Sequence, residues 1–443
     1  MTRVLRSAVK KNQTKEDLTS KLNACKNSKT KRNYKIKVLA KSEVVQQNSI
    51  WNINSILSNI FKYTEKNDLI KFNTVCKRWN DVTNPIIHKT IKLQRKRAFQ
   101  NKDHDKRFNK AAKTDAEVEM CIANNSKHAK YIKEFNFNEN LEPQRAIKLF
   151  ETFKFITNLT VGGSMSQDQF ISMIIPLTQL QELNLSSLGI KRIIKNKFIS
   201  EPAVLPASLT KLTLGRVYLY KNPELFIQTI NSHTNLIEYK FSSYNGANFL
   251  DPFFKNYPTL KIFDYNHEKI NHSQSLIKVF ESNSHLKTLK LSLSCYNDAL
   301  ITSISSHLIN LEEFNFSEIY SYPETQISII SKLSHPTKIK KLNLSWDKLS
   351  QCSVNSILLY CPYLEELYLK HAPSYLNTAS DISIESSKLA NIKKLKLRYN
   401  HLSKISYNSI ITKCAQIKEL DIVLPDKWKE CMKTTVQCME PRS

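Results

Sequence analysis

Pairs of neighbouring acidic residues are the feature of this sequence that most resembles catalytic chemistry. Glu312-Glu313 and Glu365-Glu366 could act as a general acid and a general base, which requires carboxyl groups held close to a substrate. However, both pairs stand at matching places of a repeated pattern, where they alternate with Lys340-Lys341 and Lys393-Lys394. This alternation indicates a solvated sheet face on which opposite charges pair across strands. We therefore expect no catalytic residues here.

The other residue types that serve catalysis or cofactor binding are scattered. The nine cysteines contain no Cys-x-x-Cys and form no cluster with histidine at zinc-binding spacing. The five glycines do not have the spacing of a phosphate-binding loop, and the eleven histidines are spread along the chain. The sequence therefore predicts a protein that is not an enzyme and that needs no metal and no cofactor.

A group of aromatic and basic residues near the C-terminal end offers binding chemistry instead. The group consists of Trp346, Tyr368, Lys370, His371, Lys396, Arg398 and Tyr399. Aromatic residues and arginine are frequent anchors of protein interfaces, and a basic group favours an acidic or phosphorylated peptide. Our hypothesis is that these residues bind a client protein. The alternative is an ordinary charged surface that Glu365, Glu366 and Glu419 balance.

These residues belong to a pattern, Leu-x-x-Leu-x-Leu with conservative replacements, that occurs twelve times. Its intervals of 24 to 29 residues are the period of a leucine-rich repeat. The first residues of the twelve units are Ile132, Ile156, Leu180, Leu209, Leu236, Leu260, Leu286, Leu311, Ile339, Leu364, Ile392 and Ile417. Within each unit, alternation places the apolar residues of a strand in the core and the intervening residues outside.

No single unit of this kind can bury its apolar face alone, so neighbouring units must stack. The predicted fold is an α/β leucine-rich-repeat solenoid of about twelve repeats over residues 131–443, including a C-terminal cap. Its strands form one parallel sheet on the concave side, and its helices lie on the convex side. The longest interval predicts a local loop around 190–208, where Pro202 and Pro206 interrupt any helix.

Residues 49–93 have a different pattern, with apolar residues at helical spacing. The first stripe consists of Ile56, Leu57, Ile60 and Phe61, and the second of Leu69, Phe72, Val75, Cys76 and Trp79. A polar turn separates them, Asn67 or Asp68 is the predicted N-cap of the second helix, and Pro85 is predicted to end or redirect it. Two short helices cannot bury both apolar faces on each other, so part of this surface should contact a partner or the next segment.

This segment resembles an F-box, the short helical module that docks onto the linker subunit of SCF-type ubiquitin ligases. The resemblance rests on the string NDLIKFNTVCKRWNDV and on Ile56-Leu57 followed by Ile60-Phe61. Members of the family normally begin with Leu-Pro, where this sequence has Asn52-Ile53. The resemblance implies that Trp79 supports the core of the module. It also implies docking through Ile53, Ile56, Leu57, Ile60, Phe61, Leu69 and Val75.

Together with the repeats, the module makes the chain similar to F-box/leucine-rich-repeat proteins. This resemblance implies a non-catalytic, substrate-recruiting adaptor of an SCF-type ubiquitin ligase. Its F-box would bind the linker subunit and through it a cullin, and its repeats would bind the client for ubiquitination. Two alternatives remain open. One is a repeat scaffold without ligase association, and the other is a polyanion-binding protein that uses its basic segments.

Those basic segments carry much of the net charge of +27. Residues 1–48 hold thirteen Lys and Arg and three acidic residues and are predicted to be a disordered tail. Residues 94–130 are predicted to form a basic helical connector and an N-terminal cap. The chain has no long apolar run and no signal peptide. We therefore expect a soluble protein of the cytoplasm, the nucleus or both, with no membrane contact; nucleic acid is an unlikely partner, and the sequence contains no signal for homo-oligomers.

Overall fold

The chain forms two compact units, residues 1–87 and residues 88–443. The structure is a computed structural model that describes residues 54–93, 109–138, 141, 143–192, 201–243, 255–267, 273–292, 298–317, 335–345, 351–370, 387–398, 404–414 and 416–423. The predicted tail 1–48 and the C-terminal cap beyond residue 423 lie outside the described residues.

The described part of the first unit, residues 54–87, contains three helices where the sequence predicted two. The helices span residues 54–61, Lys66–Phe72 (α2) and Lys77–Ile87 (α3). The apolar stripe from Leu69 to Trp79 is not one helix, because a turn at 73–76 separates α2 from α3. The prediction of a single second helix was therefore wrong, although the helical character of the segment is confirmed.

Two predicted helix boundaries in this unit were also wrong. α2 begins before Asn67 and Asp68, and Glu65 occupies the N-cap position without a side-chain hydrogen bond. Pro85, which was predicted to end or redirect the helix, lies inside α3. Because Pro85 is in the last turn, its missing N–H removes a single helical hydrogen bond before α3 ends at Ile87.

Polar side chains of α3 hold the turn that precedes it. The amide of Asn73 donates a hydrogen bond to the side-chain oxygen of Asn84 at 3.3 Å, and the hydroxyl of Thr83 donates to the side-chain oxygen of Asn73 at 3.1 Å. Asn84 also donates to Asn80 at 2.6 Å. Thr83 is fully buried. Since buried polar groups need hydrogen-bond partners, this network explains why the apolar stripe is interrupted at Asn73.

Three aromatic rings form the centre of the first unit. The ring centroids of Phe61, Phe72 and Trp79 lie 5.3 to 5.7 Å apart, with one ring from each helix. Two of the three contacts are edge-to-face, an arrangement that adds stability beyond the burial of area. The predicted role of Trp79 in the core of the module is thus confirmed.

The second unit is built on one sheet of fourteen strands in which every described pair of neighbours is parallel. The strand order follows the chain from β1 to β14, except that β6 pairs with β4 and lies off this path. The strands are β1 (Thr90–Leu93), β2 (Glu134–Phe137), β3 (Asn158–Ser166), β4 (Glu182–Lys191), β5 (Lys211–Gly215), β6 (Tyr218–Tyr220), β7 (Glu238–Ser243), β8 (Ile262–His267), β9 (Thr288–Ser292), β10 (Glu313–Ser317), β11 (Lys341–Ser345), β12 (Glu366–Lys370), β13 (Lys394–Arg398) and β14 (Glu419–Val423).

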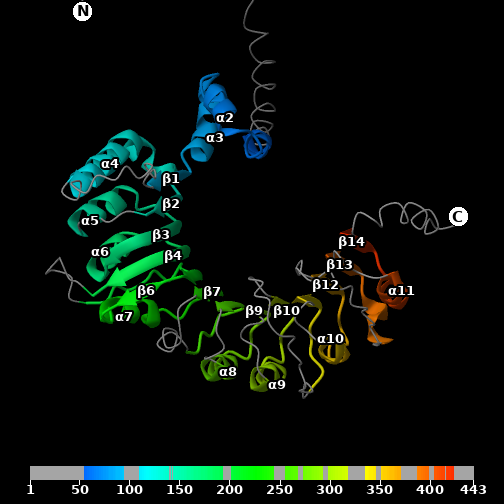
Figure 1. Ribbon diagram of the computed structural model, residues 1–443. Helices are drawn as coiled ribbons and strands as arrows, with labels where there is room; N and C mark the ends of the chain where they lie inside the picture. Colours follow the sequence, from blue (N-terminus) through cyan, green and yellow to red (C-terminus); the bar gives the residue numbers. More distant parts are fainter. Residues whose placement is uncertain are drawn as a thin grey trace, which may run out of the picture. The chain divides into compact units, whose positions relative to one another are not determined.

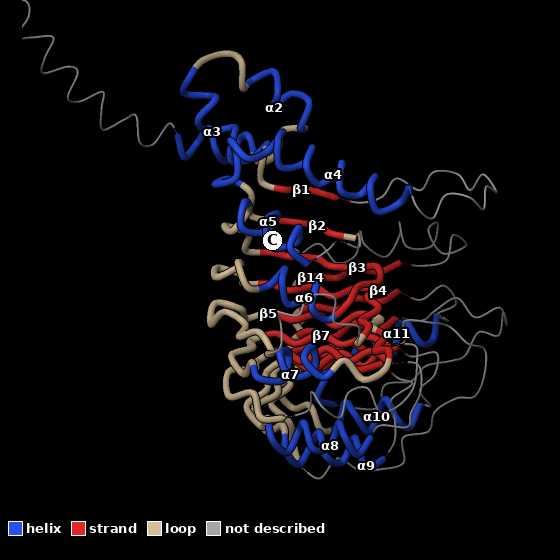
Figure 2. Tube along the Cα trace, turned by 90° about the vertical axis from the view of Figure 1, so that its left-hand side faces the viewer, coloured by secondary structure: helices blue, strands red, loops and turns tan. Residues whose placement is uncertain are grey.

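Helices cover one side of this sheet, which curves so that the helices are on its convex side (Figures 1 and 2). They are α4 (Asn109–Asn125), α5 (Pro143–Thr152), α6 (Gln167–Ile174), α7 (Glu224–Ser232), α8 (Ser273–Ser282), α9 (Asp298–His307), α10 (Gln351–Leu359) and α11 (Lys404–Lys413), with the short 3₁₀ helices η1 (Ser126–Tyr131) and η6 (Ser387–Asn391). The predicted solenoid, with strands on the concave side and helices on the convex side, is confirmed.

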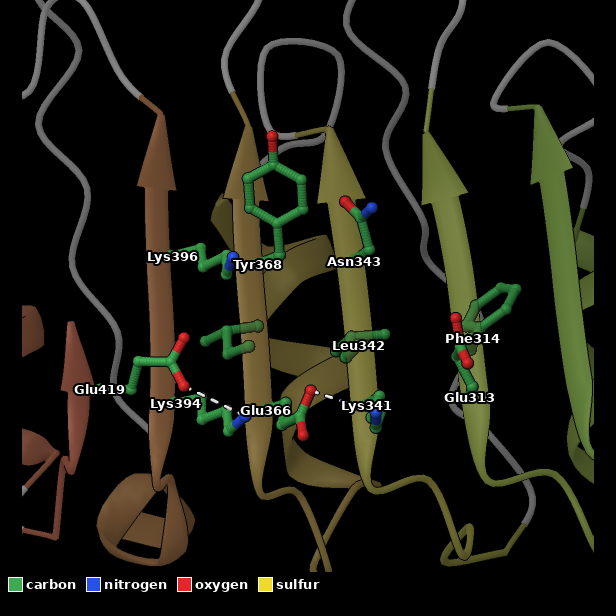
Figure 3. A pocket seen from close by; sticks show the side chains of 11 residues that line it. Glu313, Phe314, Lys341, Leu342, Asn343, Glu366, Tyr368, Lys394, Lys396 and Glu419 are labelled. Atoms are coloured by element: carbon green, nitrogen blue, oxygen red, sulfur yellow. Dashed lines mark ion pairs between the residues drawn. The ribbon is translucent and has the colours of Figure 1, made fainter. Parts of the chain in front are cut away.

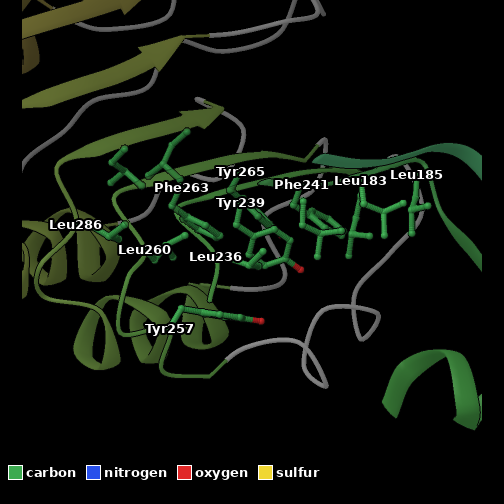
Figure 4. Packing of buried hydrophobic residues seen from close by; sticks show 14 of the residues in the cluster. Leu183, Leu185, Leu236, Tyr239, Phe241, Tyr257, Leu260, Phe263, Tyr265 and Leu286 are labelled. Carbon is green, nitrogen blue, oxygen red and sulfur yellow. The ribbon is translucent and has the colours of Figure 1, made fainter. Parts of the chain in front are cut away.

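All twelve predicted repeat units contain a strand, and each strand begins two residues after the first residue of its unit. The apolar strand residues lie opposite one another along the sheet, as Leu183 does with Leu212 and Phe263 with Leu289. These four side chains are at most 2% exposed. Figure 4 shows how the rings of Tyr239, Phe241, Phe263 and Tyr265 continue this layer between leucines of neighbouring units. Each repeat therefore buries the next.

An additional strand, β1, precedes the twelve predicted units. It pairs with β2, and Ile91 and Leu93 lie opposite Phe135 and Phe137. Two residues before this strand, His88 stands where the next unit has Ile132, and 44 residues separate the two positions. The leucine pattern is therefore incomplete and the interval is too long for a regular repeat. As a result, the module predicted at 49–93 ends with a strand that belongs to the array.

The sheet becomes irregular in the longest repeat interval, 180–209, and in the unit before it. β3 and β4 extend beyond the other strands, with a bulge between Val161 and Gly163, and β6 adds to the extension of β4. Gly163 has a φ of 82°, a conformation that glycine adopts without steric cost. Residues 201–208 contain no helix, as Pro202 and Pro206 predicted, and residues 193–200 lie outside the described part.

Candidate functional site

The residues predicted to dock onto a linker subunit fall into two groups in the three-helix module. Ile56, Ile60 and Val75 are 55%, 56% and 61% exposed. Ile56 and Ile60 stand one turn apart on the first helix, so they share a face. Leu57 is partly buried, and Ile53 lies outside the described residues. The exposed group is available to a partner without any rearrangement.

The second group corrects the prediction. Phe61 and Leu69 are only 3% exposed, so they belong to the core of the module and not to a docking surface. Phe61 contacts Phe72 and Trp79 in the aromatic cluster. The sequence could not separate the two groups, because a helical stripe contains both the residues that face the other helices and those at its margins.

Two further apolar side chains of the module are exposed that the sequence did not single out. Ile70 on α2 is 49% exposed, and Tyr63, after the first helix, is 92% exposed. Ile70 follows Leu69 directly, so it lies outside the apolar stripe at helical spacing and the sequence pattern does not indicate it. The large apolar side chains that the described part of the module exposes are therefore Ile56, Ile60, Tyr63, Ile70 and Val75, and this set is called the apolar face of the module.

Four of the predicted client-binding residues, Tyr368, Lys370, Lys396 and Arg398, are described, and they lie on the concave face of the array. Tyr368 and Lys396 face each other in register on β12 and β13, and so do Lys370 and Arg398. The structure therefore brings these four together. Trp346, His371 and Tyr399 lie outside the described residues.

The charged residues of this face form a ladder across the strands. Lys341 Nζ is 3.4 Å from a carboxylate oxygen of Glu366, and Lys394 Nζ is 3.1 Å from one of Glu419 (Figure 3). Next to this row, Lys396 pairs with Asp421 at 3.6 Å. Of the predicted basic group, Lys396 is thus neutralised within the array, together with its neighbour Lys394.

The acidic pairs Glu312-Glu313 and Glu365-Glu366 take part in the same ladder. Glu312 forms ion pairs with Lys287 at 2.8 Å and with Lys340 at 3.5 Å, and Glu365 forms one with Lys393 at 3.1 Å. The hydrogen bond from Lys287 holds the pKa of Glu312 below its usual value. A carboxyl group with a low pKa is a poor proton carrier at neutral pH. The prediction of cross-strand charge pairing is confirmed.

A hollow of about 320 Å³ lies on the concave face above β10 to β14. Figure 3 shows Tyr368 standing between Asn343 and Lys396 at one side of it, with the charged row of Lys341, Glu366 and Lys394 at the other. This volume is at the lower end of the range for ligand pockets. It is large enough to receive a side chain of a bound peptide.

Within the described part of the chain, no group of three or more His, Cys, Asp or Glu could hold a metal ion. The buried Cys361 and Cys414 are 1% and 3% exposed, and burial raises the pKa of the Cys414 thiol to about 11. Such a thiol is not a nucleophile at neutral pH. None of the described helices has the length and apolar character required to cross a membrane.

Comparison with known families finds a match to the F-box-like family over residues 54–94, so the chain contains an F-box-like domain. None of the curated proteins matches the chain. Among solved structures, the crystal structure of a TLR13–ssRNA13 complex matches with 14% identity and a TM-score of 0.33, covering 67% of this chain and 52% of that one. The present chain therefore spans about half the length of that relative. A leucine-rich-repeat protein of Leptospira interrogans, LIC12759, matches with 16% identity and a TM-score of 0.30, covering 71% and 84%.

Proposed function

We propose that this protein is a substrate-recruiting adaptor of an SCF-type ubiquitin ligase. The F-box-like domain would bind the linker subunit and through it a cullin, and the repeat array would hold the client. The adaptor would contribute proximity, since tethering raises the effective concentration of client lysines at the ligase. It would perform no bond chemistry of its own.

The observation that supports this proposal most directly is the apolar face of an F-box-like domain. Five of the fifteen large hydrophobic side chains that are exposed in the described residues belong to this small module. Isolated exposed apolar residues are normal, whereas several of them on one small unit indicate a protein interface. Burying an isoleucine or valine contributes roughly 1.5–3 kcal/mol, so a few of these residues suffice for stable docking.

The proposal is tested with a double substitution, Ile60→Asp with Val75→Asp, in the full chain. Both side chains are more than half exposed, so the charges should leave the module folded while placing carboxylates in an apolar interface. We expect capture by the purified linker subunit to fall by at least about tenfold. Circular dichroism and thermal unfolding should remain those of the parent chain.

The matched control is Asn59→Asp with Asn67→Asp, which introduces the same two carboxylates and the same change of net charge at exposed polar positions of the module. We expect this variant to bind the linker nearly as well as the parent. Equal binding by all three chains would place the interface elsewhere. Absence of binding by the parent would favour a repeat scaffold without ligase association.

A further inference from the structure

Charged residues that face each other on neighbouring strands of the array are almost always of opposite sign. In the described strands, nine register pairs join a basic to an acidic residue, among them Lys211 opposite Glu238 and Lys240 opposite Asp264. Opposite charges in this position stabilise a sheet and like charges destabilise it. The charge pattern of the face is thus an ordered one.

One pair of neighbours within the described strands departs from this pattern. Lys370, the last residue of β12, lies directly opposite Arg398, the last residue of β13. Neighbouring strands are about 4.8 Å apart, so two positive side chains rise from adjacent points of the sheet. Both are exposed, and no described carboxylate lies within ion-pair distance of either.

The cations around this pair are neutralised, which confines the excess charge to two residues. On β13, Lys394 pairs with Glu419 and Lys396 with Asp421, four and two residues before Arg398. A polyanion such as nucleic acid requires cations spaced along its length. Two adjacent cations, one of them an arginine with its planar fork, instead match a single carboxylate or phosphate group.

The aromatic ring of Tyr368 stands next to this pair. Tyr368 precedes Lys370 by two residues on β12, so both side chains point to the concave face. The ring also borders the hollow of about 320 Å³. A ligand held by its anionic group at Lys370 and Arg398 could therefore place a neighbouring side chain in this hollow, against Tyr368.

We propose that Lys370 and Arg398 bind the carboxylate or phosphate of an acidic peptide segment of the client, with an adjacent side chain in the hollow beside Tyr368. This inference rests on the proposed function, in which the array holds the client. Repulsion between the two cations destabilises the sheet when no anion is bound. Residues that lower stability in this way are typical of functional sites, where binding requires them.

The test uses the full chain and immobilised random-sequence peptides whose central residue is glutamate, phosphoserine or glutamine. We expect the first two pools to retain the protein and the glutamine pool to retain much less; the stronger of the two acidic pools identifies the anion. Lys370→Glu with Arg398→Glu should weaken retention by about tenfold or more. Single-stranded RNA should not displace the peptides.

The matched control is Lys92→Glu with Lys191→Glu, which makes the same change of net charge at exposed sheet positions away from the hollow. It should bind the acidic pools as the parent does. Equal loss in both variants would reduce the effect to the net charge of the chain and overturn the proposal. Retention of no pool by the parent, or displacement by RNA, would overturn it as well.

A stability measurement separates this role from a merely structural one. The single substitution Arg398→Glu converts the like-charge pair into an opposite one, so the thermal unfolding temperature should rise while peptide binding falls. An unchanged or lower unfolding temperature would show that the two cations do not repel each other. The peptide assay contains no linker subunit, so its failure is distinguishable from a failure of linker docking.

Discussion

The three-helix module and the repeat array differ in how completely they bury their apolar residues. In the array, strand residues such as Leu289, Leu342 and Leu395 are at most 2% exposed, because each repeat covers its neighbour. In the module, Ile60 and Val75 are more than half exposed. Three short helices can enclose one aromatic cluster but do not offer enough surface to cover the remaining apolar residues.

This difference indicates which kind of interaction each unit can make with a partner. Stacking satisfies the apolar residues of the array, so its open face consists of charged and polar side chains such as Lys341 and Glu366. Recognition there must depend on charge and shape. Recognition by the module must depend on burial of apolar area, which is non-directional and strong.

The largest expected difference between the two units is the loss of folding stability when an apolar residue of each is replaced by aspartate. Leu342→Asp buries a charge between β10 and β12 and should destabilise the array by more than about 4 kcal/mol, with loss of its cooperative unfolding transition. Val75→Asp should change the stability of the module by no more than about 0.5 kcal/mol. Thermal unfolding followed by circular dichroism measures both. Similar losses in the two variants would contradict the assignment of Val75 to a free surface.

A smaller loss of stability is expected when the polar network of the module is disrupted. Thr83→Val keeps the volume but leaves the side-chain oxygen of Asn73 without that donor, and it should cost about 1–3 kcal/mol of stability. Thr74→Val is the control, since Thr74 is exposed and its hydroxyl donates only to the carbonyl oxygen of Lys71. A denaturant titration that reports the module, for example through the fluorescence of Trp79, measures the difference. Equal midpoints for the two variants would show that the network contributes little.

The smallest expected effect concerns pH and is confined to the array. His233 is 6% exposed, and burial lowers its pKa, although the hydrogen bond at 2.7 Å to the carbonyl of Leu209 acts in the other direction. The unfolded chain then binds a proton more readily than the folded one. Stability contributed by neutral His233 is present above about pH 6.5 and is lost as the pH falls below that value.

The loss can be at most about 1.4 kcal/mol for each pH unit, because one proton is involved. His233→Gln removes the titration, so its unfolding temperature should decline less than that of the parent between about pH 7 and pH 5.5. Parallel declines in both chains would assign the pH dependence to other groups.

Much of the array could be predicted because its signal is repeated. A period of leucines that recurs twelve times identifies every strand from β2 to β14 apart from β6, and the alternation within each strand separates core from face. Glu312 and Lys340 could even be expected to pair, since equivalent positions of successive repeats lie side by side. β1 was missed because His88 replaces the first leucine and the following interval is too long.

The module was less predictable, because its signal occurs only once. Helical spacing identified the apolar residues but not which of them face the other helices, so Phe61 and Leu69 were assigned to docking although they form the core. The break at Asn73 depends on hydrogen bonds to Thr83 and Asn84, which only the folded chain brings close. The site at Lys370 and Arg398 could be suspected from composition. The neutral state of its neighbours required the register of the strands.

The measurement that tests the central claim most directly is the affinity of the full chain for the purified linker subunit of an SCF-type ligase, determined by calorimetry. We predict specific, submicromolar binding with a negative heat-capacity change, which is the mark of buried apolar surface. Binding should be lost in the chain that carries Ile60→Asp and Val75→Asp. No measurable binding by the parent chain, or binding that the double substitution leaves unchanged, would contradict the account.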